Sequence, residues 1–203
     1  MAEILGLSPV QDGAWEDVDE PAREVALRKQ RPTLRGSIRG YAASVWQRAY
    51  YLQQGDSRPY LRTPFYALAL ELPAPASVRL TIEPTGLQED APSLASRWPV
   101  AHAGDLAFDA EARVTSPQPA EADAYLSSEL RSAILDFFAR FACDNPTDHR
   151  ADLRRAVLGW FEIETSQVTY TTFCLPEKLS AGAGRMQCAA PVLDALAQAA
   201  RRA

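Results

Sequence analysis

The sequence is poor in several residue types that often carry chemistry or mark a membrane protein. It has two histidines, three cysteines and, among 21 basic residues, only the lysines Lys29 and Lys178. It contains no run of 18 apolar residues, so we expect no membrane span. Residues 1–20 hold neither a basic stretch nor a long apolar run. We therefore expect no secretory signal and a cytoplasmic protein.

The cysteines do not form a metal-binding pattern. Cys143, Cys174 and Cys188 are odd in number, and their spacing is unlike that of a zinc site. Reduced thiols fit a cytoplasmic protein. The sequence therefore predicts no metal and no cofactor.

The charge balance disfavours nucleic acid as a partner. The formal net charge is −5 and the sequence pI is about 5.1. An acidic chain is repelled by phosphate, so nucleic acid is not expected to be the main partner. The dense basic cluster is Arg150, Arg154 and Arg155, which could still form a local patch.

The length and composition are those of a globular domain. With 203 residues, of which 47% are hydrophobic, the chain can bury a substantial core. Residues 1–30 are acidic and weakly patterned, and are expected to form an N-terminal arm that is free to move. Residues 31–203 are expected to form a single α+β domain.

The first half of the domain is patterned as strands. Residues 33–52 are rich in glycine and aromatic residues and predict one or two strands, although AASVWQRAYYL also suits a helix. Residues 66–72 and 78–83 alternate between apolar and other side chains, which is typical of half-buried strands. The turn sequences QQGDSRP and PAPA separate these segments. Successive strands with short connections predict an antiparallel meander.

The second half combines helices with a hairpin. From about residue 120 an apolar stripe at helical spacing predicts a helix. The stripe is Leu126, Leu130, Ile134, Phe137, Phe138 and Phe141. Alternation on both sides of residues 165–167 predicts a hairpin, residues 176–187 read as a flexible link, and residues 189–202 suit a C-terminal helix. The order predicts an antiparallel sheet, made of the meander and the hairpin, with two helices packed on one face.

One short motif raises the question of catalysis. In GDLAFD, residues 104–109, two carboxylates lie four residues apart and follow His102. On a strand Asp105 and Asp109 would be about 13 Å apart, which is too far to share a proton. The preferred interpretation is a turn in which the Asp105 side chain accepts a hydrogen bond from the backbone N–H two residues later. The candidate catalytic residues are His102, Asp105 and Asp109. A triad of Ser96, His102 and Asp105 could be assembled, but the sequence has no G-x-S-x-G motif around a nucleophilic serine.

A second group of candidates is aromatic. Such residues either fill one face of a sheet or form a binding surface, since Tyr and Trp are enriched at interfaces. The candidate binding residues are Tyr41, Trp46, Tyr50, Tyr51 and Tyr60.

The segment GDLAFDAEARVTSPQPAEADAYLSSELRSAILDF resembles a pattern of an uncharacterised family of bacterial domains of unknown function. In that family a Gly-Asp-x-x-Phe-Asp strand entry precedes a Leu-rich helix, a hairpin and a C-terminal helix. The matching residues here are Gly104, Asp105, Phe108 and Asp109. The resemblance covers residues 33–203 and implies the fold without an established activity. Many relatives are tied to membrane segments, which this chain lacks.

Two functions from different classes follow. The first is a non-enzymatic cytoplasmic interaction or regulatory module, which binds a protein partner through residues 41–66 or a sheet edge. The alternative is a small hydrolase with an Asp/His site around residues 102–109. We prefer the first because no cluster of reactive residues is sharp. The sequence leaves the partner and the oligomeric state open.

Overall fold

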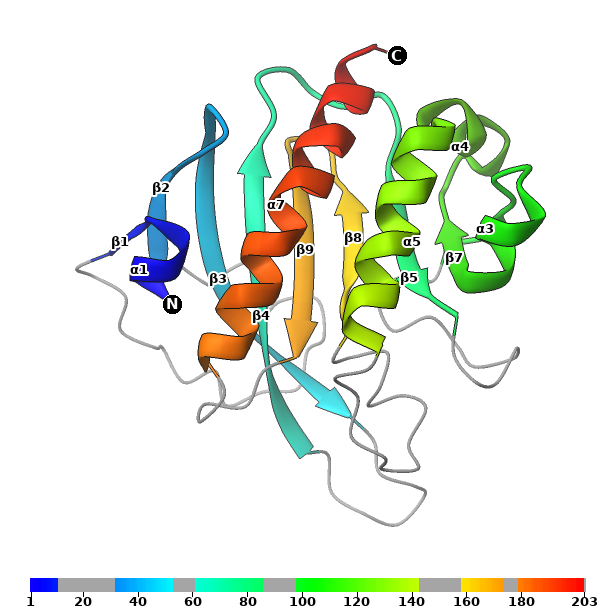
Figure 1. Ribbon diagram of the computed structural model, residues 1–203. Coiled ribbons are helices and arrows are strands. Elements are labelled where there is room, and N and C mark those ends of the chain that lie inside the picture. The colour runs from blue at the N-terminus through cyan, green and yellow to red at the C-terminus, as the bar shows by residue number, and fades with distance from the viewer. Residues whose placement is uncertain (11–31, 53–60, 86–97, 143–157, 174–178, 203) are drawn as a thin grey trace.

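The computed structural model describes residues 1–10, 32–52, 61–85, 98–142, 158–173 and 179–202 (Figure 1). Its strands are β1 (Ser8–Pro9), β2 (Leu34–Ile38), β3 (Tyr41–Leu52), β4 (Leu61–Glu71), β5 (Leu80–Pro84), β6 (Val100–Ala101), β7 (Ala112–Thr115), β8 (Trp160–Ile163) and β9 (Gln167–Phe173). Its helices are α1 (Ala2–Leu5), α3 (Leu106–Glu111), α4 (Pro119–Tyr125), α5 (Ser128–Ala142) and α7 (Leu179–Arg202).

The described part of the chain is an α+β fold, as predicted. The strands form an antiparallel sheet in the order β1-β2-β3-β4-β9-β8-β5-β7-β6. Helices α5 and α7 lie across one face of this sheet, and α1 lies beside α7 (Figure 1). The expectation of two main helices on one face is confirmed.

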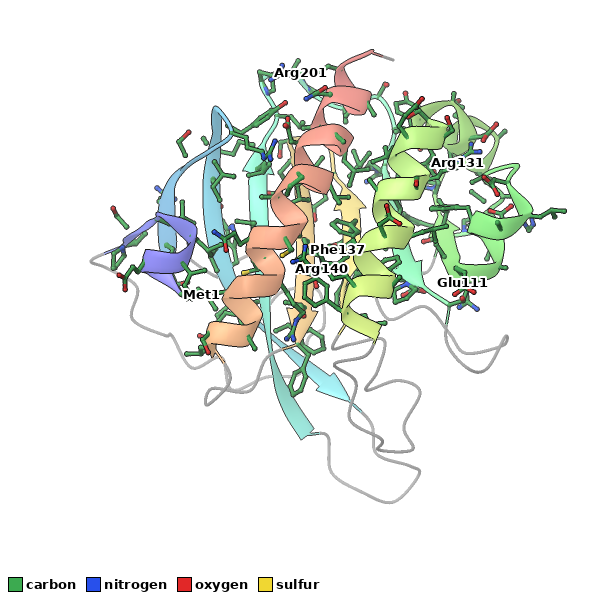
Figure 2. All side chains as sticks on the ribbon, in the orientation of Figure 1. Met1, Glu111, Arg131, Phe137, Arg140 and Arg201 are labelled. Carbon is green, nitrogen blue, oxygen red and sulfur yellow. The ribbon has the colours of Figure 1, made fainter. Side chains whose placement is uncertain are left out.

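The core lies between those helices and the sheet. Leu68 of β4 pairs with Tyr170 of β9, and both are fully buried. The Phe137 ring of α5 (Figure 2) meets Tyr170 at 5.1 Å and Phe161 of β8 at 5.2 Å between ring centroids. These edge-on contacts between rings add to the burial of apolar area. The predicted stripe is therefore the contact between α5 and the sheet.

The expected order of strands is wrong in one respect. Strands β2, β3 and β4 form a meander, but β5 does not pair with β4, because the β8–β9 hairpin lies between them. The chain passes over the turn of that hairpin, where Leu72 N–H donates to Ser166 O and Ala76 N–H to Thr165 O, each at 2.8 Å. The PAPA sequence therefore carries the chain to a distant strand.

The helix predicted from residue 120 is two helices. α4 ends at Tyr125 with Leu126 as its C-cap, and α5 begins at Ser128. The flexible link predicted over residues 176–187 is also wrong from Leu179 on, because α7 begins there. Ala183 and Met186 are fully buried, so packing offsets the poor helix propensity of the glycines in AGAGR.

The N-terminal arm and the domain boundary stay predictions for residues 11–30, which lie outside the described residues. The first ten residues pack against the sheet: β1 pairs with β2, and Leu5 and Leu7 are buried.

Candidate functional site

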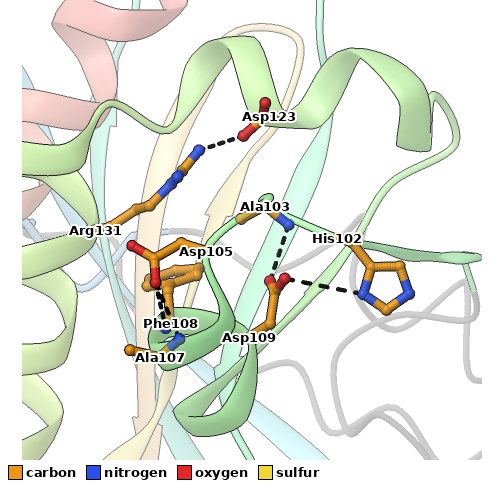
Figure 3. Close-up of polar contacts among 8 residues, drawn as sticks. All are labelled: His102, Ala103, Asp105, Ala107, Phe108, Asp109, Asp123 and Arg131. Carbon is orange, nitrogen blue, oxygen red and sulfur yellow. Dashed lines mark hydrogen bonds and ion pairs between the residues drawn. The ribbon is translucent and has the colours of Figure 1, made fainter.

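The GDLAFD motif begins a helix and not a strand. Asp105 is the N-cap of α3, and its Oδ1 accepts from the N–H groups of Ala107 at 3.0 Å and Phe108 at 3.1 Å (Figure 3). The predicted bond to the backbone two residues on is present, but the strand entry that the resemblance implies for this motif is a helix here. Residues 106–111 are helical, and β7 begins only at Ala112. Asp105 satisfies two backbone donors that the first turn would otherwise leave open.

Asp109 turns back toward the strand that precedes the helix. Its Oδ1 accepts from Ala103 N–H at 2.9 Å, and its Oδ2 lies 4.0 Å from His102 Nδ1 (Figure 3). The His102 side chain is 84% exposed and that of Asp109 is 19% exposed. Asp109 therefore fixes the chain between β6 and α3, and it attracts His102 when the imidazole is protonated.

Two helices beside this corner are joined by an ion pair. Arg131 of α5 pairs with Asp123 of α4 (Figure 3), and a methyl group placed on Gly104 would lie 3.6 Å from the Asp123 carboxylate. Gly104 has a φ of 69°, a conformation that suits glycine. The corner is thus held by capping and ion pairing between neighbouring elements.

The geometry leaves the catalytic interpretation without a nucleophile in the part described. No described hydroxyl or thiol is hydrogen-bonded to His102, and Ser96 lies outside the described residues, as does His149. Asp105 faces its own helix, whereas Asp109 faces His102. The roles of these three residues stay predictions, and an acid/base pair of the two aspartates is not what the contacts favour.

The aromatic candidates lie in four different settings. Tyr41 is buried at 7% exposure, and the Arg201 guanidinium lies 5.0 Å from its ring centre. Trp46 is partly buried, and its Nε1 donates to Ser44 Oγ at 2.8 Å. Tyr50 and Tyr51 belong to β3, where they pair with Thr63 and Arg62. Tyr60 lies outside the described residues.

Strands β3 and β4 extend beyond the rest of the sheet. They pair with each other as far as Leu52 and Leu61, whereas the described parts of β2 and β9 pair as far as Val45 of β3 and Phe65 of β4. Figure 1 shows the two strands running past the lower margin of the sheet. We call residues 46–52 and 61–64 the hairpin arm. Among the described residues, the arm has no third strand on either side.

Two exposed apolar residues near β6 are not predicted by the sequence patterns. Val100 is 54% exposed and Leu106 is 92% exposed. Val100 lies within residues 87–103, which have no clear apolar period in the sequence, and Leu106 follows shortly after them. The sequence pattern gives little indication of a strand here, because β6 has only two residues.

Tyr170 and Arg185 are polar residues in the core that the sequence patterns do not single out. The Tyr170 hydroxyl donates to Leu158 O at 2.6 Å, and burial raises the pKa of this phenol. Arg185, in the AGAGR sequence, is 8% exposed and donates to Phe173 O at 3.0 Å. Both side chains tie the ends of β8 and β9 to neighbouring backbone.

The described ranges show neither a metal-binding cluster nor a membrane-spanning helix. In them, no three His, Cys, Asp or Glu side chains are placed to bind a metal ion together. No helix in those ranges is both long and apolar enough to cross a bilayer. Cys188 lies partly buried in α7, whereas Cys143 and Cys174 fall outside the described residues.

Comparison with known proteins gives a fold and no family. The sequence matches no known protein family and no curated protein. The crystal structure of the mycobacterial trehalose monomycolate transport factor A, TtfA, is similar, with a TM-score of 0.50 and 13% sequence identity. The similarity covers 96% of this chain and 89% of that one. At this identity it shows a shared fold, and the resemblance to a family of bacterial domains stays a prediction.

Proposed function

We propose that the chain is a non-enzymatic, cytoplasmic interaction module that binds a protein partner through the hairpin arm. The observation that supports this most directly is the length of β3 and β4 relative to their neighbours. In the described residues, no strand adjoins the end of this hairpin on either side. On the β2 side this begins at the pair Trp46↔Ala67, and on the β9 side it begins at Pro64.

A two-stranded ribbon of this kind is well suited to bind. An isolated hairpin is marginally stable in water, so it gains stability when a partner covers it. Each outer edge offers backbone donors and acceptors to which an extended segment can add as a further strand. The arm is therefore a natural place for a partner to complete the sheet.

The residue types of the arm match those of protein interfaces. It contains Tyr50, Tyr51, Arg48 and Arg62, and it contains no acidic residue, although the whole chain has a net charge of −5. Tyr and Arg are among the residues that most often dominate binding energy at interfaces. The basic character of the arm favours a partner with an acidic surface.

Two further observations support a role outside catalysis. The hydrogen bonds that Asp105 and Asp109 accept come from backbone N–H groups of the same corner. The structurally similar protein is named a transport factor, which is consistent with an accessory role for this chain.

Quantitative affinity capture from a native lysate tests the proposal. The baits are the wild type, Tyr50→Ser/Tyr51→Ser, and a control with the exposed helix substitutions Ser132→Ala and Gln187→Ala. We expect at least one protein to be captured by the wild type and the control but to fall about tenfold or more with the arm variant. Losing two interface tyrosines costs more than about 1 kcal/mol each, and about 1.4 kcal/mol is a tenfold change in affinity. Identical capture by all three baits would contradict the proposal.

A further inference from the structure

No described strand pairs with the outer edge of β6. β6 is the last strand of the sheet on its side, and it pairs only with β7 among the described strands. Ser116 N–H donates to Pro99 O at 3.0 Å, so positions 99 and 116 form a hydrogen-bonded pair. Hydrogen-bonded and non-hydrogen-bonded pairs alternate in antiparallel strands. Val100, which pairs with Thr115, therefore directs its N–H and C=O away from β7.

This edge is apolar at its centre. Val100 is 54% exposed and is one of three large apolar residues that are exposed in the described part of the chain. Proteins usually protect a free edge with charge, a bulge or a covering segment. An exposed valine beside outward backbone groups instead offers both hydrogen bonds and apolar area.

The two ends of the edge carry opposite charges. Before β6, the exposed Arg79 guanidinium lies 5.3 Å from the ring centre of Trp98. After β6, the Asp109 carboxylate lies beside His102. One Asp109 oxygen accepts from Ala103, and the other has only the 4.0 Å approach of His102 among the described residues.

We propose that the β6 edge is an interface between two copies of this chain, related by a two-fold axis through Val100. In such a pairing, Val100 N–H of each copy donates to Val100 O of its partner. Position 98 of one copy then faces position 102 of the other, so Arg79 comes close to the partner's Asp109. An isologous contact needs a surface that is complementary to itself.

The charges favour a second copy over an unrelated peptide. Opposite charges at the two ends of one strand match each other only when that strand pairs antiparallel with itself. A two-residue strand also offers few backbone bonds, so an isolated flexible peptide would gain little from it. A folded second copy adds the contacts at both ends without the cost of ordering a free segment.

Sedimentation of the full chain tests this inference. We expect the wild type and Val100→Thr to form dimers that dissociate on dilution, and Val100→Pro to remain monomeric. Proline removes the outward N–H but leaves the bonds to β7, to which Val100 does not donate. A monomeric wild type at the highest concentration, or a dimeric Val100→Pro, would overturn the proposal. The proposal would also be overturned if the wild type is monomeric by itself and captures another protein that Val100→Pro does not capture. The edge would then bind a different partner.

Cysteine cross-linking gives an independent test of the axis. The three native cysteines are replaced by serine, and Val100→Cys is compared with the exposed control Ser132→Cys on α5. Facing residues in a hydrogen-bonded pair are about 5.5 Å apart at Cα, within the range of a disulfide. Mild oxidation should yield a covalent dimer of Val100→Cys only. Equal yields of covalent dimer from both cysteine variants would reject the two-fold pairing. The Tyr50→Ser/Tyr51→Ser variant should still dimerise in sedimentation, because it leaves β6 intact.

Discussion

Gly159 shows how a single residue sets the entry to a central strand. It precedes β8 with a φ of 77°, and a Cβ at this position would overlap Thr171 O and come within 2.9 Å of the Tyr170 ring. The left-handed conformation alone costs a non-glycine residue about 1–2 kcal/mol. The backbone of the adjacent β9 leaves no space into which a side chain at position 159 could shift.

Gly159→Ala should therefore lower the free energy of unfolding by more than about 2 kcal/mol, measured by urea denaturation. Gly184→Ala is the matched control, because a methyl group at this position would meet nothing within 4 Å and the residue sits inside α7. That change should be neutral or stabilise by up to about 1 kcal/mol. Equal destabilisation by both would show that the close approach to Thr171 is not decisive.

Tyr170 provides a second test at this scale. Its hydroxyl donates to Leu158 O at 2.6 Å in the core. Tyr170→Phe would leave that carbonyl without its partner, at a cost of about 1–3 kcal/mol in the free energy of unfolding. Chemical denaturation at pH 7 measures this cost, and an unchanged midpoint would count against the bond.

The same residue predicts a pH dependence in the alkaline range. Burial raises the pKa of Tyr170 above its ordinary value of 10.0. The folded state then keeps a proton that the unfolded state releases, so wild-type stability is complete below pH 10 and falls as the pH rises further. In Tyr170→Phe this part of the decline should be absent. Parallel declines in both proteins would contradict the assignment.

At the scale of elements, α3 depends on its first residue. Asp105 accepts from two backbone N–H groups, and the helix has only six residues. Asp105→Ala should cost about 1 kcal/mol and speed amide exchange at Ala107 and Phe108. Asp105→Asn should cost less, because asparagine is also a good N-cap. Equal effects of the two substitutions would show that capping is not the role of this side chain.

The elements that the sequence predicts well are those with a clear period. The stripe through Ile134 and Phe137 defines α5, and the alternation around residues 165–167 defines β8 and β9. The start of α7 is not predicted because the glycines in AGAGR are poor helix formers, while burial of Ala183 and Met186 holds the helix together. Helix α3 is not predicted because its six residues are too few to show a period.

At the scale of the whole molecule, the order of strands escapes sequence reasoning. Residues 66–72 and 78–83 are neighbours in the chain, yet a hairpin from residues 160–173 separates them in the sheet. Pairing of β4 with β9 joins Leu68 to Tyr170 and Leu70 to Val168, which are all fully buried. Such a choice depends on distant residues, and local patterns do not contain it. The length of the hairpin arm beyond its neighbours is likewise visible only in the sheet.

The hairpin arm is the proposed surface for a partner, and site-specific photo-cross-linking can show whether a protein contacts it. A photoreactive phenylalanine replaces Tyr51 on the arm or, as the control, Ser132 on the exposed side of α5, and both proteins are irradiated in native cells. We expect a discrete protein adduct from position 51 that is absent or far weaker from position 132. No adduct at position 51, or the same adducts from both positions, would contradict it.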